Sequence, residues 1–187
     1  LAAHRRERAE LAVFAAFALL LLWLLGNVAA PFLAPHGSIN LGNTGSVGDS
    51  DNDGAISLID SGIARFFYRM GDTNCHQHAD RSFFLNGNQM PFCARCTSIF
   101  LGLALGAALM IFLDLELHIA WIILGLVPMG VDGGLQLISE FNYESNNALR
   151  FATGSLAGLV TGIALGFVVS ELGKMMVMRR RIRKGSG

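Results

Sequence analysis

Residues 11–30 read LAVFAAFALLLLWLLGNVAA, an uncharged run in which Asn27 is the single polar residue. An α-helix rises 1.5 Å per residue, so about 20 apolar residues cross the roughly 30 Å hydrocarbon core of a bilayer. Three further apolar runs follow at residues 97–113, 119–138 and 151–172, and the first of these extends backwards through Cys96. The sequence therefore predicts an all-α membrane protein built as a bundle of four transmembrane helices.

The composition agrees with this class, because 52% of the 187 residues are hydrophobic and 15% are charged. A typical soluble domain carries more charge. The formal net charge is zero, so no global basic surface indicates a nucleic acid, and we expect membrane lipid as the partner. The first run follows Arg5, Arg6 and Arg8 and also fits a secretory signal peptide. We favour a retained anchor, because the run is longer than a usual signal core.

The basic residues predict the orientation. Nine of the fourteen Lys and Arg residues lie in the two tails, before residue 9 and after residue 173. Because such residues mark the cytoplasmic side, we expect both termini in the cytoplasm and residues 31–95 and 139–150 outside. We divide the chain into a basic tail with the first transmembrane helix (1–30), an extracytoplasmic segment (31–92), and transmembrane helices two to four with a basic C-terminal tail (93–187).

Small residues recur at helical spacing in the second and fourth spans. They are Gly102, Gly106, Gly154, Gly158, Gly162 and Gly166. Small residues four apart let helix backbones approach closely, so we interpret them as packing surfaces. Pro128, with glycines around it, predicts a kinked or locally unwound third span.

The outer segment contains a calcium-loop pattern at residues 49–60, DSDNDGAISLID. Alternating oxygen ligands suit a hard cation, and the expected ligands are Asp49, Asp51, Asp53, the carbonyl of Ala55, and Asp60. The loop resembles those of the EF-hand and dockerin families, and closure by Asp rather than Glu is nearer to dockerins. The alternative is a solvated acidic turn. Bound calcium would brace a following helix over about residues 57–70, with an apolar face of Ile59, Ile63, Phe66, Phe67 and Met70.

Three cysteines and neighbouring histidines form a candidate metal set. Cys93 and Cys96 have a two-residue gap at the start of the second span, where helix amide dipoles favour thiolate. With Cys75 and either His76 or His78 they offer three sulfurs and one imidazole, which suits zinc; we assign His76 as the imidazole.

Two other interpretations of the cysteines stay open. A four-helix membrane bundle with an outward Cys-x-x-Cys resembles quinone-coupled disulfide-forming enzymes. Those usually need a second cysteine pair, and only Cys75 remains here, which favours metal. A structural disulfide with no further role is the third interpretation.

Charged and amide residues at the outer ends of the spans form a candidate catalytic set. An acid in a membrane span is costly, so Asp132, with Gln136 on the same helical face, is a functional candidate; the alternative is a structural ion pair with an arginine. The other members are Arg81, Arg95, Arg150 and Glu144. The inner halves of spans two to four carry no acid, base or amide, which disfavours a channel or transporter.

Several spaced motifs resemble one family. The motifs are CHQ at 75–77, RSFF at 81–84, CARCT at 93–97, DGGLQ at 132–136, SNNALR at 145–150 and TG at 153–154. Together they resemble the prokaryotic membrane-protein family 2085 of the domains of unknown function (DUF2085), over residues 75–166. The resemblance implies a small multi-helix membrane protein and brings no established activity. The calcium loop lies outside the matched motifs.

Three functional hypotheses follow. The first is a zinc-dependent hydrolase or transferase in the cell membrane, with its site facing the extracytoplasmic side. Asp132 or Glu144 would be its base, and Arg81, Arg95 and Arg150 would hold an anionic, lipid or lipid-linked substrate. All the polar groups would then share one pocket. The second is an extracytoplasmic thiol-disulfide oxidoreductase, and the third a non-enzymatic, calcium-braced binding or assembly subunit. The oligomeric state is not predicted.

Overall fold

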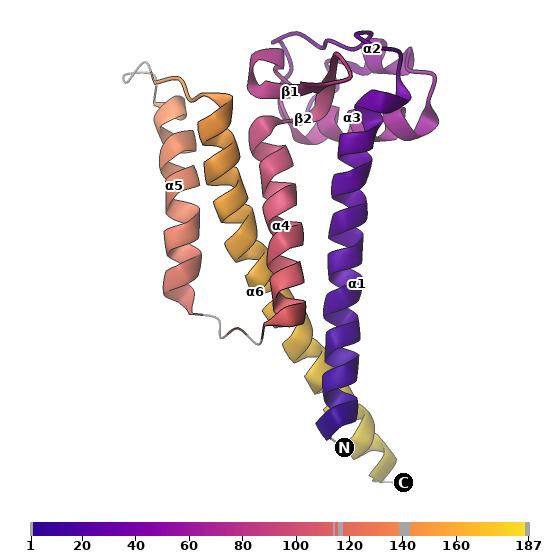
Figure 1. Cartoon of the computed structure of the whole chain (residues 1–187), viewed down its shortest axis with the longest axis vertical. Helices are drawn as coiled ribbons and strands as arrows, with labels where there is room; N and C mark the ends of the chain where they lie inside the picture. Colours follow the sequence, from indigo (N-terminus) through magenta and orange to yellow (C-terminus); the bar gives the residue numbers. More distant parts are fainter. Residues whose placement is uncertain (1, 114, 116–117, 139–142, 186–187) are drawn as a thin grey trace.

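Four long helices dominate the computed structural model, which describes residues 2–113, 115, 118–138 and 143–185 (Figure 1). They are α1 (Ala2–Ala29), α4 (Ala94–Phe112), α5 (Ile119–Leu137) and α6 (Asn147–Gly185). Within the described residues, the four segments long and apolar enough to cross a bilayer are 10–33, 94–112, 119–136 and 147–176. The prediction of a mostly helical membrane protein with four spans is confirmed.

Glycines bring α4 and α6 into backbone contact. A Cβ atom added to Gly102 would lie 2.3 Å from the carbonyl oxygen of Ser155. One added to Gly158 would lie 2.3 Å from the carbonyl oxygen of Ile99. Separations this short exclude any side chain larger than hydrogen, so the interpretation of these glycines as packing surfaces is confirmed.

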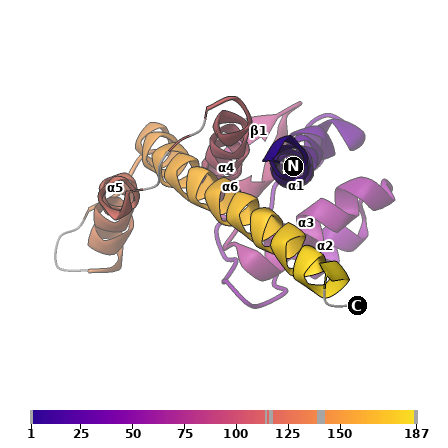
Figure 2. The ribbon, with the colours of Figure 1, turned by 90° about the horizontal axis from the view of Figure 1, so that it is seen from below.

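Helix α5 lies at the outside of the bundle and packs against α6, which separates it from α4 in the view along the bundle (Figure 2). Its helical backbone continues through Pro128, so the local unwinding expected there is not observed. Exposed apolar side chains of α5 include Trp121, Leu124 and Val131, which a bilayer would cover.

The head region (residues 30–93) covers one end of α1 and α4 (Figure 1). It contains η1 (Ala30–Leu33), α2 (Asp53–Ser57), α3 (Gly62–Asn74), η2 (Ala79–Arg81), and the antiparallel strands β1 (Ser82–Leu85) and β2 (Asn88–Cys93). This hairpin was not among the predicted elements. It turns at Asn86 and Gly87, whose φ angles are +53° and +71°. Asn-Gly favours this left-handed pair, which matches the twist of the strands.

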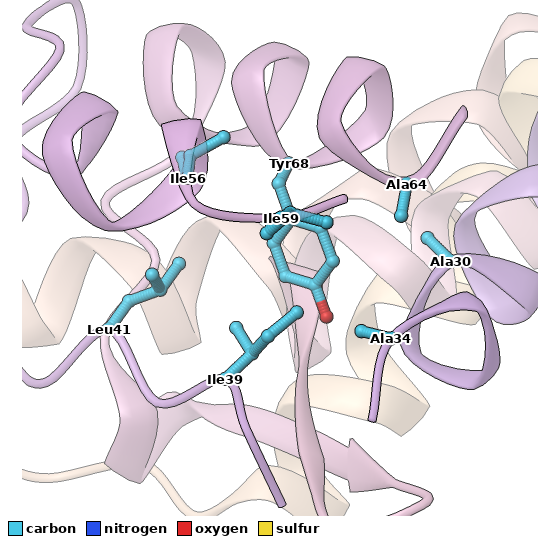
Figure 3. Close-up of a cluster of buried hydrophobic side chains, with 8 residues drawn as sticks. All are labelled: Ala30, Ala34, Ile39, Leu41, Ile56, Ile59, Ala64 and Tyr68. Carbon is cyan, nitrogen blue, oxygen red and sulfur yellow. The ribbon is translucent and has the colours of Figure 1, made fainter. Parts of the chain in front are cut away.

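An apolar core holds the head region together (Figure 3). Its buried members come from η1, the loop after it, α2, the connection between α2 and α3, and α3 itself: Ala30, Ala34, Ile39, Leu41, Ile56, Ile59, Ala64 and Tyr68. The helix expected over about 57–70 begins later, as α3 at Gly62, after the short α2 that ends at Ser57. Ile63 and Phe66 of the expected apolar face are exposed, while Ala64 and Tyr68 of α3 face the core.

The candidate site residues and the chain termini lie at opposite ends of the molecule. The head region, the end of α5 and the start of α6 lie together, and both termini lie at the opposite end (Figure 1). All described residues of the candidate metal and catalytic sets therefore belong to one end of the bundle.

Candidate metal centre and polar cluster

Three elements bring the cysteines together. Cys75 ends α3 as its C-cap residue, and Cys93 ends β2 and is the N-cap residue of α4. Cys96 lies in the first turn of α4, as the sequence predicted. The backbone N–H of Cys93 donates to the Sγ atom of Cys75 at 3.4 Å, so the strand is held against the end of α3.

The sulfur atoms and one imidazole form a compact group. The possible ligand atoms of Cys75, His76 and Cys93 lie within 4.8 Å of one another. The Cys96 thiol forms side-chain hydrogen bonds with both Cys75 and Cys93. All three cysteines of the chain are free thiols, so the structure contains no disulfide between them. Three sulfurs and an imidazole are a tetrahedral zinc set.

An aromatic shell surrounds the sulfurs. Trp23 of α1, Phe92 of β2 and Phe100 of α4 pack around them, together with Met70. Cys75 and Cys93 are only 2% and 4% exposed. Cys96 and His76 are half-buried, so the group is mostly covered by the head region and the bundle.

Burial and the hydrogen bonds between the thiols shift the pKa values of the cysteines. Hydrogen bonds from the thiols of Cys75 and Cys96 hold the pKa of Cys93 well below its ordinary value. The Cys75 thiol donates a hydrogen bond to Cys93 and is buried, and together these raise the pKa of Cys75 to about 11. The hydrogen bonds within the group therefore favour a thiolate at Cys93 over one at Cys75.

His76 is oriented by its neighbours. Its Nδ1 atom accepts a hydrogen bond from the backbone N–H of His78 at 3.1 Å, and the two imidazole rings lie 4.5 Å apart. His78 has a different partner, since its Nε2 atom lies 3.0 Å from the carbonyl oxygen of Gly45. The structure therefore brings His76, not His78, to the sulfurs.

A separate polar cluster lies between α4 and α5. Arg95 Nη2 donates to Asp132 in a short ion pair and to the Oε1 atom of Gln136 at 3.0 Å. The Asp132 carboxylate is 3% exposed and also accepts from the hydroxyl of Tyr143 at 2.9 Å. This hydrogen bond raises the pKa of Tyr143 above its ordinary value. Sequence reasoning missed Tyr143, because its position between two spans carries no periodic signal.

Arg150 and Arg81 extend this cluster towards the head region. Arg150 is 5% exposed and donates to the Oδ1 atom of Asn147 at 3.0 Å. The side-chain amide of Asn147 in turn donates to the carbonyl oxygen of Asp80 at 3.2 Å, next to Arg81. Glu144, the other proposed base, is exposed in the connection before α6.

The single pocket expected from the sequence is therefore two clusters on different faces of the first turn of α4. Arg95 points to α5 while Cys96 packs with the aromatic shell. Successive residues of a helix are separated by about 100°, which explains how neighbours in the sequence reach different partners.

The acidic residues of the predicted calcium loop are all exposed and do not converge on a shared point. Asp53 pairs with Arg69 at 3.2 Å, and Asp51 accepts from the backbone N–H of Ser46 at 2.8 Å. Asp49 is exposed, and Asp60 and Ala55 line a cavity of about 270 Å³ in the head region. Calcium binding by this loop stays a prediction.

The fold and the site define a four-span membrane protein with a Cys/His cluster and a polar cluster at one end. The chain belongs to the DUF2085 family of predicted membrane proteins, whose family model matches residues 75–167. The match begins at the first cysteine, so α1, the calcium-loop segment and α3 up to Asn74 lie outside it.

Two archaeal relatives support the assignment. An uncharacterized protein of Methanocaldococcus jannaschii is 44% identical over 101 residues, which cover 51% of this chain and 64% of the relative. An uncharacterized protein of Methanothermobacter thermautotrophicus is 36% identical over 88 residues, 46% of this chain and 78% of the relative. This chain thus spans less than two thirds of the first relative. No solved structure matches it.

Proposed function

We propose that this protein is a zinc-containing membrane protein whose metal centre fastens an extracytoplasmic head region to the transmembrane bundle. Both termini would lie in the cytoplasm. The observation that carries the proposal is the convergence of Cys75, His76 and Cys93 within 4.8 Å, with Cys96 hydrogen-bonded to both other cysteines.

The zinc would be structural, because four protein ligands leave no coordination position for substrate or water. Its enclosure supports this role, since Cys75 and Cys93 are almost fully buried. A hydrolase or transferase activity on an anionic or lipid-linked substrate would then belong to the polar cluster. Arg81, Arg95 and Arg150 would hold the substrate there, and Asp132 would be the base once it is released from Arg95.

Metal analysis of the purified full chain tests the proposal. We expect about one zinc ion per chain, with the three thiols unreactive until the protein is denatured in chelator. Cys93→Ser and Cys75→Ser should lose the zinc. His36→Ala, which removes an exposed histidine of the head region, is the matched control and should retain it. Wild-type protein that contains no zinc and shows three freely titrating thiols would refute the metal centre.

A second candidate is the thiol-disulfide oxidoreductase. The lowered pKa of Cys93 beside Cys96 favours it, because a thiolate next to a second thiol suits disulfide exchange. The burial of Cys75 and Cys93 opposes it, because a substrate disulfide would have to approach through the half-buried Cys96 alone. Quinone-dependent formation of a Cys93–Cys96 disulfide in the zinc-free protein would favour this candidate over the structural metal.

A further inference from the structure

Three arginines from separate elements gather in the polar cluster. Arg81 ends η2, Arg95 lies in the first turn of α4, and Arg150 lies in the first turn of α6. The hydroxyl of Ser98 ties the last two together, because it donates to the carbonyl oxygen of Arg95 at 2.8 Å and lies 3.3 Å from that of Arg150.

The charges of this group do not balance. The guanidinium of Arg150 is repelled by Arg81 and Arg95 and attracted by Asp80 and Asp132. Among the groups that act most strongly on Arg150, and with Arg150 itself counted, three guanidinium groups face two carboxylates. An uncompensated positive charge at a partly buried site is costly, and an anion carrying one negative charge would remove that cost.

Unused hydrogen-bond donors indicate where such an anion would bind. Within the described residues, the Nε atoms of Arg81 and Arg95 are buried and make no hydrogen bond, although Arg81 Nε lies 3.8 Å from the Asp80 carboxylate. The side chains of the same two arginines are 32% and 23% exposed, so part of each side chain reaches the surface. Asp132, the present partner of Arg95, is 3% exposed and lies behind it.

We propose that Arg81, Arg95 and Arg150 form a binding site for a phosphodiester group, supplied by the head group of an anionic membrane lipid. A phosphodiester carries one negative charge, and its oxygens accept paired donors from guanidinium groups. Arg95 and Arg150 begin two membrane spans, which places them at head-group depth. In the absence of lipid, the Asp132 carboxylate would accept the hydrogen bond from Arg95 that the lipid phosphate accepts in the complex.

This inference deepens the proposed function, on which it depends for the anionic class of the substrate. Native mass spectrometry of the detergent-purified full chain tests it, with dioleoyl phosphatidylglycerol as the probe. Dioleoylglycerol, which has the same acyl chains and lacks phosphate, is the matched lipid. Inorganic phosphate, added as a competitor, separates a lipid site from a site for free phosphate.

The wild-type chain should retain phosphatidylglycerol in preference to dioleoylglycerol. Arg95→Gln and Arg150→Gln should each weaken binding about tenfold or more, since each removes charged hydrogen-bond donors. Arg69→Gln is the matched control, because Arg69 is an exposed arginine of α3 paired with Asp53, and it should bind as the wild type does. Asp132→Asn should bind more tightly, because the competing carboxylate is gone.

The Asp132→Asn variant distinguishes the lipid site from a purely structural Arg95–Asp132 ion pair. If the ion pair were only structural, the substitution would give no gain in lipid affinity. Absence of that gain, or arginine variants that fold and bind as the wild type does, would overturn the inference. Displacement of the lipid by inorganic phosphate would support the oxyanion site and assign it to free phosphate. Zinc content measured on the same samples keeps the two proposals distinct: zinc present without lipid binding refutes only this inference.

Discussion

Cys93 links the secondary structure of this protein to its candidate chemistry. It ends β2, begins α4, and accepts the hydrogen bonds of two other thiols. One residue therefore joins the head region, the bundle and the sulfur group. A substitution here would remove a proposed zinc ligand, while the backbone N–H of residue 93 would still donate to the Sγ atom of Cys75.

The thiol pKa values predict how zinc affinity changes with pH. Because the pKa of Cys75 is raised to about 11, its thiol is protonated near neutral pH and zinc must displace that proton. Raising the pH from about 7 to 9 should therefore strengthen zinc binding, by roughly tenfold per pH unit for each proton released. Competition with a chelating dye measures this. Affinity that stays constant, after correction for the dye's own protonation, would contradict the role of Cys75.

Gln77 shows how a loop residue can support this site. It is 1% exposed, and its backbone has a φ angle of +45°, a left-handed conformation that non-glycine residues rarely adopt. Its side-chain amide donates to the carbonyl oxygens of Tyr68 and Pro91, at 3.0 and 2.8 Å. These contacts offset the backbone strain and direct the adjoining Cys75 and His76 towards β2.

At the scale of elements, the contact between α4 and α6 is the principal interface of the bundle. Gly158 illustrates it, because an added Cβ atom would meet the carbonyl oxygen of Ile99 at 2.3 Å and Gly102 Cα at 3.0 Å. Gly158→Leu should force the helices apart and lower the free energy of unfolding by about 1–3 kcal/mol or more. Thermal unfolding followed by circular dichroism in detergent measures the effect.

The same substitution on α5 provides the control. Gly130 has no atom within 4 Å of its added Cβ and faces outward. Gly130→Leu should therefore leave the unfolding temperature unchanged or raise it slightly, since Leu favours a helix over Gly by up to about 1 kcal/mol. An equal fall in unfolding temperature in both variants would contradict a specific need for glycine where α4 and α6 meet, because any Gly→Leu change in a helix would then destabilise the protein.

At the scale of the whole molecule, both termini lie opposite the head region. Because the tails carry nine of the fourteen basic residues, we expect them on the cytoplasmic side. A fluorescent protein fused to the C-terminal end should therefore fluoresce, and alkaline phosphatase at the same position should stay inactive. Phosphatase inserted in the loop at residues 42–48 should be active. The opposite pattern would place both candidate sites in the cytoplasm.

The sequence by itself determined the four spans, the glycine contacts and the position of Cys93 and Cys96 at the start of a span. Each depends on hydrophobicity, residue size or spacing within one short segment. The turn at Asn86 and Gly87 was also readable from the sequence, although the hairpin was not predicted.

Only the tertiary structure decided which distant groups meet. It brought Cys75 to Cys93, and it directed Arg95 and Cys96 to different partners around α4. These outcomes depend on how β2 docks against α3 and on which neighbour each face of α4 meets. No local pattern encodes them, because the burial that sets them is shared among segments far apart in the chain.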